Sequence, residues 1–232
     1  MSTRRAGFVA ACSALGAGAA HAALAAAAAD LEQRWGGPER GYHDLEHLDE
    51  VLLHLELLGV MSAPTVLAAW FHDAVYTGRS EGHGSSSDEH VTPSDEQASA
   101  DLAVLVLIDV GAPASSAARV AELVRVTERH EPGAGDAEAA ALCDADLAVL
   151  ASGPERYARY TEGVRREYCF LDDISFVAGR AAVLRRLLAR AEHDTHPDGP
   201  LFSTRAGHRL WADRALFNLR AELLHLNSGG CV

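Results

Sequence analysis

The chain has 232 residues and a formal net charge of −13 at pH 7. That length can bury one large hydrophobic core or two small ones. The acidic balance argues against a nucleic-acid polymer or an anionic membrane surface as the partner. It still allows a small phosphorylated substrate, because a bound metal can reverse the local field.

Ala and Leu dominate a composition that is 48% hydrophobic but only 6% aromatic, which favours helices over strands. No run of eighteen strongly apolar residues occurs, so we expect a globular protein without a membrane span. The four cysteines lie far apart and form no Cys-x-x-Cys pair. This pattern predicts reduced thiols and a cytoplasmic location.

The first thirty residues allow two interpretations. Arg4-Arg5 followed by an Ala/Gly-rich apolar run resembles a signal peptide. The run contains few strongly hydrophobic residues, however, and it continues without a linker to Trp35. We therefore predict an N-terminal helix within residues 1–35, covering 8–35 and ending at Gly36-Gly37-Pro38, rather than a cleaved leader.

Apolar residues recur at helical spacing through most of the remaining chain. The predicted helices cover residues 42–58, 65–74, 95–110, 114–130, 137–150, 154–169, 173–192 and 205–226. Ser94 and Gln97 have the spacing of a helix capping box. Residues 77–94, rich in Gly and Ser, form a predicted loop that borders the active site and can gate it. We predict one all-α domain over residues 1–232, with about eight or nine helices.

Candidate metal ligands gather in two stretches, Tyr42-His43-Asp44-Leu45-Glu46-His47 and Trp70-Phe71-His72-Asp73. Histidines four residues apart on a helix point the same way, about one turn from each other. Asp144-Ala145-Asp146 follows in a later helical run. Such a nitrogen and oxygen donor set suits Mn, Fe, Co, Ni or Zn, and Mg less well. One divalent ion is expected, and a second is left open.

These motifs, in this order, resemble the HD-domain superfamily of metal-dependent phosphohydrolases, in particular its bacterial branch of predicted metal-dependent HD phosphohydrolases. The resemblance spans the chain from about Trp35 to Glu222. The further matching stretches are Trp70–Tyr76, Glu96–Ala100, Thr127–His130, Asp144–Ala148 and Arg166–Tyr168. The first element departs from the family pattern, because Asp44 stands where the family has Asn.

The resemblance implies four metal ligands: His47, His72, Asp73 and Asp146. The Tyr-His-x-x-x-His element is also similar to the metal site of cyclic-nucleotide phosphodiesterases, which gives His43 the role of general acid. His43 and Asp73 are thus the predicted catalytic residues. The implied reaction is hydrolysis of a phosphoester, monoester or diester, on a nucleotide or another small phosphorylated molecule.

Five residues are candidates for substrate contact or for support of the ligands: Asp44, Glu96, His130, Asp144 and Arg166. Asp44 either orients His43 or is a solvated carboxylate, and Glu96 either caps a helix or acts as an acid near His72. His130 either contacts phosphate or ends a helix favourably. Asp144 is expected to be structural or supporting, and Arg166 either binds phosphate or pairs at the surface.

Other functions fit parts of the pattern. A non-catalytic module that binds metal and nucleotide is the main alternative, and a homo-oligomer is left open. His43-x-x-Glu46-His47 also matches an inverted zinc-peptidase motif, with Glu122 or Glu128 as a third ligand. That interpretation leaves His72, Asp73 and Asp146 unexplained. A haloacid-dehalogenase nucleophile at Asp144 is excluded, because the following Thr is replaced by Ala148.

Overall fold

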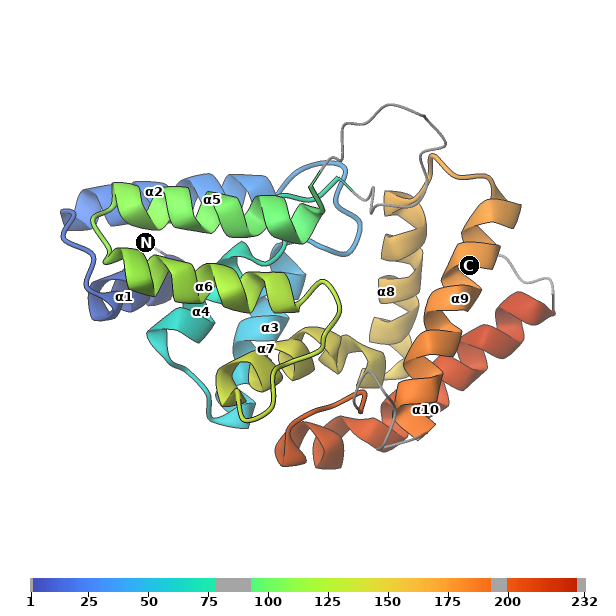
Figure 1. The fold of residues 1–232 in the computed structure, drawn as a ribbon. Helices are drawn as coiled ribbons and strands as arrows, with labels where there is room; N and C mark the ends of the chain where they lie inside the picture. The colour runs from blue at the N-terminus through green and yellow to red at the C-terminus, as the bar shows by residue number, and fades with distance from the viewer. Residues whose placement is uncertain (1, 78–92, 193–199, 229–232) are drawn as a thin grey trace. The chain divides into compact units, whose positions relative to one another are not determined.

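The computed structural model describes residues 2–77, 93–192 and 200–228. Within these ranges the chain forms ten α-helices, one 3-10 helix and no β-strand, which confirms the predicted all-α fold (Figure 1). No helix of these ranges has both the length and the apolar character needed to cross a bilayer. Most of the predicted 77–94 loop lies outside the described residues.

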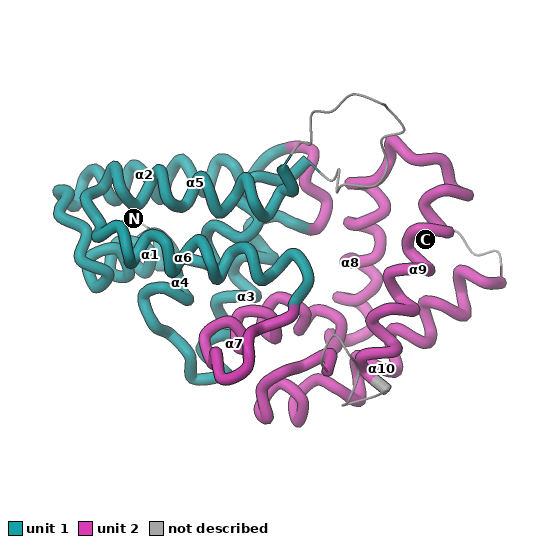
Figure 2. Tube along the Cα trace, viewed as in Figure 1, with its two compact units in different colours: residues 1–37, 43–130 teal, residues 38–42, 131–232 magenta. Residues whose placement is uncertain are grey.

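The chain divides into two compact units (Figure 2). Unit 1 comprises Met1–Gly37 and His43–His130, and unit 2 comprises Pro38–Tyr42 and Glu131–Val232. The prediction of one domain over the whole chain stays a prediction.

Helix α4 is the centre of unit 1. The unit contains α1 (Thr3–Leu15), α2 (His21–Trp35), α3 (Leu45–Leu58), α4 (Ala63–Phe71), α5 (Asp95–Asp109) and α6 (Ala114–Val126). Every residue of α4 from Thr65 to Phe71 is buried, and α4 contacts α1, α3, α5 and α6. A helix without charged side chains, apolar on all sides, is expected in such a central place.

The predicted helix over 8–35 is wrong, because two helices occupy this stretch. Gly16 ends α1 with a left-handed φ of 99°, and its backbone N–H donates to carbonyls of the last turn. The chain then crosses from Gly16 to Ala20 before α2 begins. Glycine adopts the left-handed conformation without steric cost, so Gly16 in an Ala-rich run is a stop signal that helical periodicity hides.

The other predicted helices are present, most of them with shifted ends, and the 173–192 helix has the predicted bounds. The helix expected from residue 42 begins at Leu45, and the one expected to reach 130 ends at Val126. The stretch 137–150 is α7 (Ala137–Leu147) followed by a 3-10 helix (Ala148–Ala151). The capping role of Ser94 is confirmed, since its hydroxyl oxygen accepts from the Gln97 N–H at 3.1 Å.

Unit 2 is built on α7, α8 (Pro154–Glu167), α9 (Asp173–Glu192) and α10 (Arg205–Asn227). A buried ion pair joins α9 to α10: Arg180 donates to both Glu222 oxygens, at 2.6 and 3.1 Å. Tyr157 donates to Glu222 at 2.6 Å, and Arg180 donates to the Tyr160 hydroxyl at 3.0 Å. The buried charges are therefore paired and hydrogen-bonded, as burial requires.

Candidate metal centre

His72 is the C-cap residue of α4, and because α4 is buried, the His72 side chain lies in the interior of unit 1. Its backbone N–H donates to the Ala68 carbonyl, and its side chain is 1% exposed. The ring Nδ1 lies 2.8 Å from the Ala69 carbonyl oxygen. Because a carbonyl only accepts, Nδ1 carries the proton and Nε2 presents its lone pair. Histidine ligands of metals are commonly oriented in this way.

His47 lies in the first turn of α3, and its position depends on Asp44. Asp44 has extended backbone and caps the helix, with Oδ1 accepting from the N–H groups of Glu46 at 2.9 Å and His47 at 3.2 Å. This role was not among those predicted for Asp44. It also means that His43 precedes the helix, so the expected shared helix face of His43 and His47 is wrong. The two rings nevertheless lie close, with centroids 5.7 Å apart.

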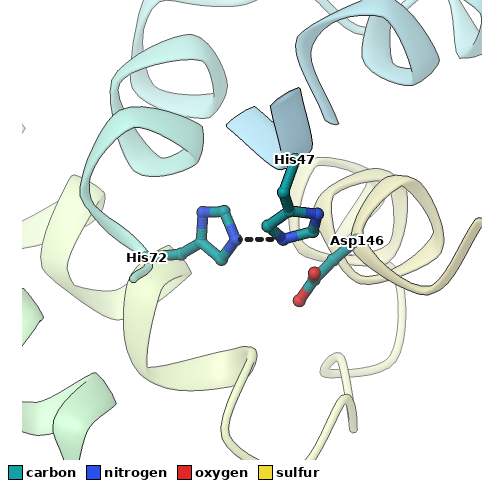
Figure 3. Close-up of side chains that lie close together, drawn as sticks. All are labelled: His47, His72 and Asp146. Carbon is teal, nitrogen blue, oxygen red and sulfur yellow. Dashed lines mark hydrogen bonds between the residues drawn. The ribbon is translucent and has the colours of Figure 1, made fainter. Parts of the chain in front are cut away.

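Three ligand atoms of unit 1 converge. His47 Nε2 lies 3.2 Å from His72 Nε2 (Figure 3), and Asp73 Oδ2 lies 3.1 Å from His72 Nε2 and 3.6 Å from His47 Nε2. Nitrogen and oxygen ligands lie about 2.0–2.2 Å from a zinc ion, so two of them on one ion are roughly 3.0–3.5 Å apart. The spacing of these atoms is that of ligands sharing one ion.

The buried Trp35 side chain packs beside the imidazole rings of His47 and His72. The fully buried Trp35 ring lies 5.3 Å from the His72 ring and 6.1 Å from the His47 ring, measured between centroids. Trp35 Nε1 donates to the Trp70 carbonyl at 2.9 Å, which fixes the indole. Asp73 is the more open ligand, at 13% side-chain exposure against 1% for each histidine. The site is therefore closed on the Trp35 side and accessible near Asp73.

The segment that follows Asp73 is tied to α5. The Val75 N–H donates to the buried Ser99 hydroxyl oxygen at 3.0 Å, and that hydroxyl donates to the Val75 carbonyl at 3.2 Å. Thr77 donates to Asp95 through its N–H and its hydroxyl, at 2.7 and 2.8 Å. This anchoring places the Tyr76 ring against His43, stacked at 4.3 Å. Sequence reasoning assigned no role to Tyr76, and only its position in the Trp70–Tyr76 stretch pointed to it.

Glu96 lies close enough to Asp73 for the two carboxylates to repel each other. Burial raises the pKa of the Glu96 carboxyl, and the Asp73 and Glu128 carboxylates raise it further. Hydrogen bonds to Glu96 from its own backbone N–H and from Ser94 act in the opposite direction. Glu96 thus takes part in the capping turn and interacts electrostatically with Asp73, while a role as an acid near His72 stays a prediction. A cation in this place would relieve the repulsion among these carboxylates.

His130 is the last residue of unit 1. Its backbone is left-handed, with φ at 54°, and its N–H donates to the Val126 carbonyl at 2.9 Å. This geometry ends the turn that follows α6. A contact of His130 with phosphate stays a prediction.

Figure 3 also labels Asp146, the predicted fourth ligand. Asp146 belongs to α7 of unit 2 and is half-buried. Its neighbour Asp144 is fully buried and accepts from the N–H groups of Ser203 and Thr204, at 2.6 and 2.8 Å, and from the Thr204 hydroxyl. These hydrogen bonds hold the N-terminus of α10 in place, so Asp144 has a structural role.

Unit 2 also holds the segment that leads into His43. The buried Glu167 carboxylate accepts from the N–H groups of Gly41 and Tyr42, at 2.9 and 2.8 Å, through one oxygen. Arg166 donates to the Gly41 carbonyl at 3.0 Å. Gly41 lies so close to the backbone of Gly163 that a Cβ there would come within 2.2 Å of it. Arg166 therefore binds backbone, and Glu167 is a positioning residue that sequence reasoning missed.

Comparisons of the chain with models of known families, with curated proteins and with solved structures gave no match. The likeness to HD phosphohydrolases accordingly rests on the motifs in the sequence, and membership stays a prediction. The case for a metal centre rests separately on the distances among His47, His72 and Asp73.

Proposed function

We propose that the protein is a metal-dependent phosphohydrolase of the HD type, which acts on a nucleotide or another small phosphoester. The observation that carries this proposal is the cluster of His47 Nε2, His72 Nε2 and Asp73 Oδ2, at separations of 3.1 to 3.6 Å. Asp146 is proposed as a fourth ligand. Four protein ligands leave positions of a six-coordinate ion for water and substrate.

The donor set fits a divalent ion such as Mn, Fe, Co, Ni or Zn better than Mg, because it contains two imidazoles. Bound there, the ion would lower the pKa of water and polarise a phosphoryl oxygen. The chain's own contribution is to hold both imidazoles with Nε2 facing inward, against a wall that excludes water. The orientation of His72 by the Ala69 carbonyl serves this purpose.

His43 is proposed as the general acid that protonates the leaving oxygen. Its ring is half-buried, stacks on Tyr76 and lies beside His47 without being one of the three converging ligands. Imidazole titrates near neutral pH, so it can give up a proton during turnover. Glu167 and Arg166 hold the preceding backbone and so restrict the positions that His43 can take.

The test is hydrolysis of bis-p-nitrophenyl phosphate, p-nitrophenyl phosphate and a panel of nucleotides with added Mn. We expect His43→Ala to lower turnover by about 10²- to 10⁴-fold while metal content is unchanged. If no phosphoester is hydrolysed by a protein that binds metal, the non-catalytic binding module is supported instead.

The zinc-peptidase alternative has a separate test. Glu46, its required base, is exposed on α3, and Glu122 is exposed and pairs with Arg119 at 3.6 Å. Cleavage of casein that is lost in Glu46→Gln would favour the peptidase. We expect no such cleavage.

A further inference from the structure

Helix α10 carries a row of exposed apolar side chains at a spacing of seven residues. Leu210, Phe217 and Leu224 are 56%, 67% and 69% exposed. The buried residues of α10, among them Trp211 and Leu219, point the other way, and α10 contacts α9 and the 3-10 helix. Seven residues make nearly two helical turns, so the three exposed side chains form one line, called here the α10 stripe.

Charged residues flank the α10 stripe in an ordered way. Asp213 and Arg220 are exposed and also seven residues apart, so they lie on one side of the stripe. Arg214 and Ala221 are exposed and lie on its other side. One side of the stripe therefore carries both signs of charge, and the other carries a cation and a small apolar residue.

This arrangement is complementary to itself when two copies pair antiparallel. A two-fold axis beside Phe217 brings the two Phe217 rings together and places Leu210 of each copy against Leu224 of the other. With such an axis, the side that carries Asp213 and Arg220 in one copy faces the corresponding side of the other copy. Asp213 precedes Phe217 by four residues and Arg220 follows it by three, so Asp213 lies within about 1.5 Å, along the helix axis, of Arg220 in the second copy.

On the other side of the α10 stripe, the antiparallel arrangement brings no two like charges together. Arg214 lies opposite Ala221 of the second copy, so it does not meet a like charge. We propose that the occupant of the α10 stripe is a second copy of this chain, and that the protein forms an antiparallel homodimer through α10. The dimer has two symmetry-related Asp213–Arg220 ion pairs. Three large apolar side chains per copy make an interface smaller than the typical ~800 Å² per partner, so the dimer dissociates on dilution.

The test is sedimentation of the full chain over a wide concentration range, with circular dichroism to verify folding. The wild-type protein is expected to show a concentration-dependent monomer–dimer equilibrium. Phe217→Lys is expected to be monomeric throughout. Leu105→Lys is the matched control, because Leu105 on α5 is also 69% exposed, and it is expected to dimerise like the wild type.

The ion pair has a charge-swap test that does not depend on the apolar row. Asp213→Arg alone and Arg220→Asp alone are each expected to weaken dimerisation by about tenfold or more, and the double variant is expected to restore most of it. A wild-type protein that is monomeric at every concentration overturns the proposal, as does a dimer insensitive to Phe217→Lys. A second double variant combines Asp213→Arg with Arg214→Asp. If this variant restores dimerisation, the two helices are parallel and the antiparallel arrangement is overturned.

Discussion

A single hydrogen bond to the Ala69 carbonyl decides which nitrogen of His72 is available to a metal. Asp44 has a comparable effect on His47, because its carboxylate fixes the residue at which α3 begins. Neither contact involves the ligand atoms themselves. Residues outside the coordinating set therefore determine whether two imidazoles and a carboxylate can meet.

The capping role of Asp44 predicts a specific pattern of stability. Asp44→Ala is expected to lower the free energy of unfolding by about 1 kcal/mol, because two N–H groups of the first turn lose their acceptor. Asp44→Asn is expected to retain most of the stability, since its side-chain oxygen can accept the same bonds. Urea denaturation with Asp109→Ala as an exposed control measures the difference. Equal losses in Asp44→Ala and Asp44→Asn would show that capping is not what Asp44 contributes.

Glu96 predicts how stability depends on pH in the metal-free protein. Its pKa is raised in the folded state, chiefly by burial, so the folded chain holds this proton to a higher pH than the unfolded chain does. Its contribution to stability is therefore lost as pH rises above the ordinary value of about 4.5. Glu96→Gln is expected to be more stable than wild type at pH 7 with EDTA, and the gain should vanish near pH 4. A gain of equal size at both pH values would contradict this cause.

The sequence pattern identified the candidate metal ligands better than it identified the residues that position them. His47, His72 and Asp73 were predicted from motifs, and their ligand atoms do converge within unit 1. The support from Tyr76 and Glu167 depends on contacts between residues 33 and 125 positions apart in the chain, which local spacing does not reveal.

Helix ends were the least predictable feature at the scale of elements. Helical periodicity runs through Gly16 unchanged because Ala and Gly fit either a helix or a turn, yet the left-handed Gly16 divides α1 from α2. The end of the predicted 42–58 helix was correct, since the capping Gly59 follows a fully periodic helix there. The pairing of α9 with α10 was not predicted, because Arg180 and Glu222 lie 42 residues apart in the chain and local spacing does not reveal such a contact.

The ion pair between Arg180 of α9 and Glu222 of α10 leads to a prediction about the stability of unit 2. Arg180→Met leaves the Glu222 carboxylate buried without its guanidinium, which is expected to cost about 3–5 kcal/mol of unfolding free energy. Arg180→Met with Glu222→Leu is expected to cost less, because no buried charge remains. Chemical denaturation measures both, with the exposed Arg185→Met on the same helix as control. A single variant no less stable than that control would show that the pair is not structurally important.

At the scale of the whole molecule, a metal that binds only the folded chain must stabilise it. We expect added Mn or Zn to raise the melting temperature of the wild-type protein and EDTA to reverse the rise. Asp73→Ala is expected to abolish most of the shift, because it removes a ligand without disturbing the core around α4. A shift of wild-type size in Asp73→Ala would indicate that the ion binds elsewhere.

The most direct test of the metal centre is the metal content of purified protein after equilibration with Co and removal of free ion. The wild-type chain and His54→Ala, which removes a histidine from α3 outside the cluster, are expected to retain at least one ion per chain. His47→Ala and His72→Ala are each expected to lose the ion held by these side chains. Wild-type content in both variants would contradict the account.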